Sequence, residues 1–160
     1  MVHKITFDIE NRTPFYLIPN GQFAFWGNTN SGPETIKPYS IGSGGVFQAS
    51  AAPWVGSAGI SGCRIANPAI WIAMLGSDPD WRAEANSARV AMSTKPLTMD
   101  KDLYNYMYSA NVTNLTLSTP NGHINERFFD DDTTALFTLN FYKGTGVTDE
   151  ALGVVVPEEK

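Results

Sequence analysis

This chain has little of what catalysis and metal binding require. Its 160 residues include one cysteine and two histidines, and only 17% of them are charged. Cys63 has no second cysteine to pair with, and its apolar, glycine-rich neighbourhood favours a buried, unreactive thiol. His3 and His123 lack the close spacing of metal ligands and are typical of surface histidines. We therefore expect a protein that is not an enzyme, with no catalytic residues, no metal and no cofactor.

Acidic and serine clusters also lack the spacing that their chemistry needs. Asp130, Asp131 and Asp132 come without the spaced oxygen ligands and closing glutamate of a calcium loop, which favours a solvated turn. Ser57 lies between glycines, but the spacing is not that of a nucleophile elbow, and no base accompanies it. The carboxylates on either side of Pro79 would suit acid and base catalysis as a pair, yet a loop is the simpler interpretation.

Basic clusters and long apolar segments are missing as well. The chain has 11 Lys and Arg against 16 Asp and Glu, a net charge of −5, so it offers no cationic surface to nucleic acid or to anionic lipid. The longest apolar run, residues 69–75, is far too short to cross a bilayer, and no signal peptide is visible. We expect no nucleic-acid partner, and a chain that is cytoplasmic or released without a conventional signal.

Glycine, proline and aromatic residues are abundant instead. The chain contains 14 Gly, 10 Pro, 4 Trp, 6 Tyr and 9 Phe, with no long stretch of helical periodicity, which is typical of strands joined by tight turns. We predict an all-β fold, an antiparallel β-sandwich flanked by one or two short helices. The length fits one domain, which we place at residues 1–143, with residues 144–160 as a loosely attached C-terminal tail in which the alternative, docking of Val154-Val155-Val156 on a sheet edge, stays open.

Several segments have the patterns of strands and loops. Alternation of Ile5, Phe7 and Ile9 with polar residues predicts a strand with one buried face. Residues 69–75 are apolar throughout, which predicts a central strand, and residues 134–142 alternate as the last strand. Gly, Ser, Asn, Thr and Pro dominate residues 28–45, which indicates a long loop.

Two Asn-Gly pairs and one capping pattern complete the expected elements. Asn-Gly between apolar runs favours a tight hairpin, which predicts that residues 15–18 pair with 23–26 and that residues 112–118 pair with 123–129. Thr98 is suited to an N-cap, and acidic residues follow it, which predicts a short helix over residues 98–108.

An aromatic cluster provides the strongest indication of function. The loop Gly76-Ser77-Asp78-Pro79-Asp80-Trp81 follows the expected central strand, and Tyr104 and Tyr108 share one face of the expected helix. Trp and Tyr combine a large apolar face with a polar tip, which suits membrane interfaces, sugar stacking and capture of quaternary ammonium groups. This pattern predicts a shallow aromatic pocket for an uncharged or zwitterionic head group. The alternative, that some of these rings only cap the sandwich, stays open.

The serial order of these features resembles the actinoporin-like pore-forming cytolysins, whose β-sandwich is shared with fungal fruit-body lectins. The resemblance covers about residues 4–143. It runs through Lys4-Ile5-Thr6-Phe7-Asp8-Ile9-Glu10-Asn11, Gly59-Ile60-Ser61-Gly62, Ser77-Asp78-Pro79, the pair Tyr104 and Tyr108, and the strand from Ala135 to Phe141.

The resemblance implies a phosphocholine-binding pocket. The positions that match it are Ser61, Ser77, Pro79, Tyr104 and Tyr108, and Trp81 joins them as a ligand-binding ring in the adjoining loop.

Two departures from the family pattern affect this pocket and the pore. Ser109 stands where the family often has another tyrosine, which weakens choline capture. Only three residues precede Lys4, where actinoporins place the amphipathic helix that lines their pore.

The resemblance therefore implies a toxin-type, cytolysin-like module that recognises lipid head groups such as phosphocholine at a target membrane and lacks the usual piercing element. The alternative is a glycan-binding lectin of the fungal fruit-body type without lytic activity. Both leave a homo-oligomer or a partner protein open.

Overall fold

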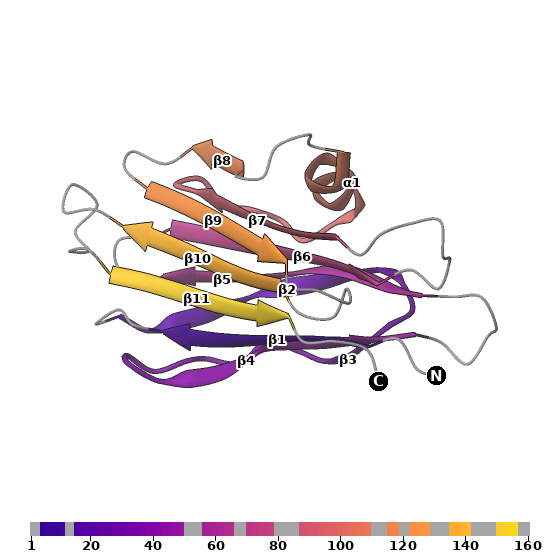
Figure 1. The fold of residues 1–160 in the computed structure, drawn as a ribbon, viewed down its shortest axis with the longest axis horizontal. Helices are drawn as coiled ribbons and strands as arrows, with labels where there is room; N and C mark the ends of the chain where they lie inside the picture. The colour runs from indigo at the N-terminus through magenta and orange to yellow at the C-terminus, as the bar shows by residue number, and fades with distance from the viewer. Residues whose placement is uncertain are drawn as a thin grey trace.

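The chain folds as an all-β sandwich of two sheets with one short helix among the described residues (Figure 1). The computed structural model describes residues 4–11, 15–49, 56–65, 70–78, 87–109, 115–118, 122–128, 135–141 and 150–156. The six-stranded sheet contains, in spatial order, β3 (Asn28–Ser31), β4 (Ile41–Gln48), β1 (Lys4–Asn11), β11 (Glu150–Val156), β10 (Ala135–Phe141) and β9 (Gly122–Phe128). The five-stranded sheet contains β2 (Leu17–Trp26), β5 (Ser57–Ile65), β6 (Ile70–Asp78), β7 (Ser87–Ser93) and β8 (Leu115–Ser118). Neighbouring strands are antiparallel except β7 and β8, which are parallel.

The main core lies between the two sheets. The alternation predicted for the first strand is confirmed, because Ile5, Phe7 and Ile9 of β1 are all buried and face the five-stranded sheet. The Phe7 ring meets Phe47 of β4 edge to face, with ring centroids 5.9 Å apart. The predicted central strand is also confirmed, since β6 lies between β5 and β7.

A second apolar layer covers the outer face of the five-stranded sheet. Successive residues of β6 point to opposite faces, so Ile72 and Met74 join the main core while Ala73 and Leu75 face the helix α1 (Lys101–Ser109). Tyr104 and Met107 are the buried residues of α1, and they complete this outer layer. The order of layers is therefore six-stranded sheet, five-stranded sheet and helix.

The helix begins later than predicted. Its N-cap is Asp100, whose Oδ1 accepts a hydrogen bond from the Leu103 backbone N–H at 2.8 Å, while its carbonyl accepts the Tyr104 N–H at 3.0 Å. The prediction that Thr98 caps the helix is wrong, because the side chain that accepts the capping hydrogen bond from the Leu103 N–H is that of Asp100. The capped first turn positions Tyr104 against the sheet.

The first predicted hairpin is wrong. Leu17–Trp26 is one strand, and both of its halves pair with β5, through Pro19 opposite Cys63 and Gln22 opposite Ser61. The register shifts between these pairs, and Gly21 has φ 84°. Asn-Gly favours a positive φ, and a β-bulge uses that conformation as readily as a hairpin turn does.

The second predicted hairpin is wrong as well. Residues 115–118 form β8, which pairs with β7 in the five-stranded sheet, whereas residues 122–128 form β9, which pairs with β10 in the six-stranded sheet. Strands β8 and β9 therefore belong to different sheets and do not pair as a hairpin. The expected loop over residues 28–45 is likewise shorter than predicted, since it contains β3 and the start of β4.

Part of the expected tail belongs to the sandwich. Glu150–Val156 forms β11, an interior strand of the six-stranded sheet, with Val154 opposite Ile9 of β1 and Phe137 of β10. Residues 135–141 form a strand as predicted, but it is not the last one. A division at residue 143 would remove the strand that joins β1 to β10.

Candidate ligand-binding site

The two serines expected in the pocket lie on opposite faces of the five-stranded sheet. Ser61 stands opposite Met74, a residue of the main core, and Ser77 stands opposite Ala58, a residue of the layer under the helix. Because side chains across an antiparallel pair point to the same face, Ser61 faces the other sheet and Ser77 faces outward. The structure does not bring these two hydroxyls to one site.

Ser61 links the two sheets. It is fully buried, and its hydroxyl donates a hydrogen bond to the carbonyl oxygen of Gly44 in β4. A buried hydroxyl gains more from such a bond than an exposed one, because leaving it unpaired costs about 1–3 kcal/mol. Ser61 is therefore a structural contact in the sandwich and lies away from the surface.

Ser77 remains close to the expected loop but is also buried. Its side chain is 3% exposed, and the hydroxyl has no hydrogen-bond partner among the described residues. It precedes Pro79 and Trp81, which both lie outside the described residues. The role of Trp81 as a ligand-binding ring stays a prediction.

Tyr104 and Tyr108 come together as their spacing predicted. Their rings stack, with centroids 5.8 Å apart and planes 14° from parallel. Tyr104 is 2% exposed, whereas Tyr108 is 40% exposed. The buried tyrosine therefore acts as a base on which the outer tyrosine rests, and only the outer ring is available to a ligand.

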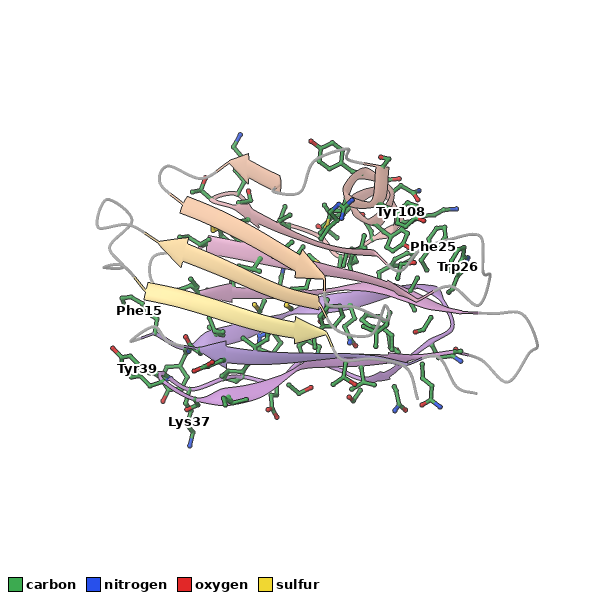
Figure 2. All side chains as sticks on the ribbon, in the orientation of Figure 1. Phe15, Phe25, Trp26, Lys37, Tyr39 and Tyr108 are labelled. Carbon is green, nitrogen blue, oxygen red and sulfur yellow. The ribbon has the colours of Figure 1, made fainter. Side chains whose placement is uncertain are left out.

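Two further aromatic residues, which are not among the predicted site residues, extend this stack. Phe25 of β2 stacks on Tyr104, with ring centroids 4.4 Å apart and planes 9° from parallel, and the Trp26 ring is tilted by 53° on Phe25 with centroids 5.5 Å apart. Figure 2 shows Phe25, Trp26 and Tyr108 together at the α1 end of the molecule. We call Trp26, Phe25, Tyr104 and Tyr108 the aromatic stack. The apolar run at residues 23–26 is the available signal, but beside Asn-Gly the same run predicts a hairpin strand.

Several other residues of α1 are exposed. Tyr106 is 54% exposed, and Lys101 and Asn105 are exposed as well. Lys101, Asn105 and Tyr108 follow one another at intervals of four and three, so they share one side of the helix. A cation, an amide and an aromatic ring thus line one exposed stripe.

Other chemistry has little support in the described part of the chain. It contains no group of three or more His, Cys, Asp or Glu residues that could hold a metal ion. Burial raises the pKa of the Cys63 thiol to about 12, which keeps the sulfur protonated and unreactive at neutral pH. Among the described residues, no helix is both long enough and apolar enough to span a membrane.

Comparison of the sequence with known proteins gave no match: no family model matches the chain, and no curated protein matches it.

Proposed function

We propose that this chain is a binding module without enzymatic activity that recognises lipid head groups such as phosphocholine at the α1 end of its sandwich. One observation carries the proposal: Tyr108 is an exposed ring held in place by the buried Tyr104 beneath it. A ring that is already ordered loses little conformational entropy when a ligand covers it.

The chemistry of the exposed stripe suits a zwitterionic head group. Tyr108 presents a π face to a trimethylammonium group, an interaction that contributes about 0.5–1 kcal/mol at an exposed site. Lys101 on the same side of the helix offers a cation to lipid phosphate. Exposed tyrosines such as Tyr106 are favoured where a bilayer meets water, because one part of the ring is apolar and the hydroxyl stays wet. The net charge of −5 disfavours anionic lipid as the target.

A glycan is the second candidate, and the ring geometry is the observation in its favour. Tyr104 and Tyr108 are nearly parallel and in contact, so they do not face each other across a cavity that would enclose an ammonium group. A single open ring with neighbouring polar groups, such as Asn105, suits stacking against a sugar.

Vesicle binding tests the first candidate. We expect the protein to sediment with vesicles that contain sphingomyelin or phosphatidylcholine, and Tyr108→Ala to weaken this binding about two- to fivefold, the loss of one exposed cation–π contact. Tyr108→Phe keeps the ring and should keep binding, and Thr29→Ala, an exposed change on β3, is the matched surface control. Circular dichroism checks that each variant is folded.

Equal binding to vesicles without choline lipids would contradict phosphocholine recognition. A glycan array run with the same proteins separates the two candidates. Sugar binding that depends on Tyr108, together with no vesicle binding, would favour the lectin alternative.

A further inference from the structure

The end of the sandwich opposite α1 carries a second exposed apolar surface. Of the large hydrophobic side chains that are exposed in the described residues, three lie in this region: Tyr16 at 49%, Tyr39 at 68% and Ile41 at 74%. Lys37 is exposed beside them. Figure 2 shows Lys37 and Tyr39 at the end of the molecule far from Tyr108. We call Tyr16, Lys37, Tyr39 and Ile41 the loop surface.

Backbone pairing brings the two parts of the loop surface together. Leu17 and Ile36 exchange two backbone hydrogen bonds of 2.9 Å, and both side chains are buried. In an antiparallel pairing the next residues, Tyr16 and Lys37, are opposite each other and point to the other face. Since that face is the exposed one, the tyrosine ring and the lysine amine emerge side by side.

Asn11 fixes the position of this surface. Its side chain is fully buried, and Nδ2 donates hydrogen bonds to the Phe15 carbonyl at 2.7 Å and to the Lys37 carbonyl at 3.0 Å. Its backbone N–H donates to the Ser40 carbonyl at 2.8 Å. One residue at the end of β1 therefore holds both segments, so the exposed rings stand on an ordered support.

Tyr39 adopts a backbone conformation that its residue type rarely takes. Its φ is 55°, in the left-handed region, and it is the one residue other than glycine with a positive φ in the described part of the chain. Such a conformation costs about 1–3 kcal/mol and is concentrated at functional sites. The residue that has this unfavourable backbone conformation carries a ring that is two-thirds exposed. The ring therefore contributes little to the core.

We propose that the loop surface is a second lipid-binding surface, whose ligand is the interface of a zwitterionic phospholipid bilayer. Ile41 is an exposed aliphatic side chain that gains free energy in hydrocarbon and has no such gain against a sugar. Tyr16 and Tyr39 suit the head-group level, where aromatic residues are enriched. Lys37 complements lipid phosphate, while the net charge of −5 favours a zwitterionic bilayer over an anionic one.

Two lipid-binding ends would allow one chain to bridge two bilayers. This consequence depends on the proposed function of the α1 end, because bridging needs both surfaces. Binding to one vesicle needs only one of them. An experiment that measures both vesicle binding and vesicle bridging therefore tests the two proposals separately.

The experiment uses vesicles of phosphatidylcholine and sphingomyelin, with sedimentation to measure binding and dynamic light scattering to measure vesicle clustering. The loop variant combines Tyr39→Asn, which tolerates the positive φ, with Ile41→Thr, which keeps a β-branched residue in β4. The α1 variant is Tyr108→Ala. Thermal unfolding checks that both variants fold, and size-exclusion chromatography measures the oligomeric state.

We expect the unchanged protein to cluster vesicles. The loop variant should lose clustering but keep its vesicle affinity within about twofold, because one of two independent lipid-binding ends remains. Binding without clustering, unaffected by the loop variant, would overturn this inference and leave the proposed function in place. Binding that the loop variant abolishes and Tyr108→Ala spares would support the loop surface and overturn the α1 proposal. A dimer that the loop variant converts to a monomer would show a second copy as the occupant and overturn the inference, and no vesicle binding at all would overturn both proposals.

Discussion

Replacing Tyr104 with alanine should destabilise the fold strongly, because the ring joins the helix to the five-stranded sheet. The side chain is 2% exposed and stacks on Phe25 at 4.4 Å and on Tyr108 at 5.8 Å. Removing a buried aromatic ring costs about 3–5 kcal/mol in the free energy of unfolding. Each aromatic pair contributes about 0.5–1.5 kcal/mol of this, and lost burial and the remaining cavity account for the rest.

Urea unfolding followed by circular dichroism measures this loss, and a thermal scan should show the melting temperature lower by roughly 6–20 °C at 2–4 °C per kcal/mol for a domain of this size. Tyr104→Phe keeps the stack and is the matched control. Tyr108→Ala should cost clearly less than Tyr104→Ala, since that ring is 40% exposed. A loss below about 1 kcal/mol for Tyr104→Ala, or equal losses at the two positions, would refute the assignment of Tyr104 to the core.

Two further predictions concern buried polar groups. Asn11→Ala should lower the free energy of unfolding by about 2 kcal/mol or more in a denaturant titration, because the Phe15 and Lys37 carbonyls lose their shared donor. Asn11→Asp should cost more than Asn11→Ala at neutral pH, since a carboxylate would face two carbonyl oxygens, and the reverse order would contradict this geometry. Burial raises the pKa of the Cys63 thiol from 9.0 to about 12, so the folded protein should resist thiol reagents at pH 8 until it is unfolded. The raised pKa stabilises the fold fully below about pH 9, where the unfolded thiol is also protonated, and this contribution should be lost between about pH 9 and 12. Denaturation midpoints of the unchanged protein and Cys63→Ala across that interval measure it, and identical pH profiles would contradict it.

The parts of the fold that the sequence predicted correctly are those determined by burial along a single strand. Alternation in β1 and the continuous apolar run of β6 both report directly which faces are covered. The first Asn-Gly pair does not form the predicted hairpin because a positive φ at Gly21 is also compatible with a bulge in one long strand. Strand pairing also depends on partners distant in the sequence, and nothing local to Glu150–Val156 indicates that it fits between β1 and β10.

The candidate site shows the same limit at the level of single side chains. Helical spacing correctly places Tyr104 and Tyr108 on one face, but it does not reveal how deep each ring lies against the sheet. That depth depends on partners distant in the sequence, such as Phe25, which stacks on Tyr104, so that Tyr104 is 2% exposed and Tyr108 40%. The loop surface gives still less signal, since Tyr39 is a single aromatic residue within a polar segment, and Asn11, which hydrogen-bonds the carbonyls of Lys37 and Ser40 around it, is distant in the sequence. The two proposed binding surfaces therefore each rest on a buried residue, Tyr104 beneath Tyr108 and Asn11 beneath the loop surface, and burial of that kind cannot be read from local sequence.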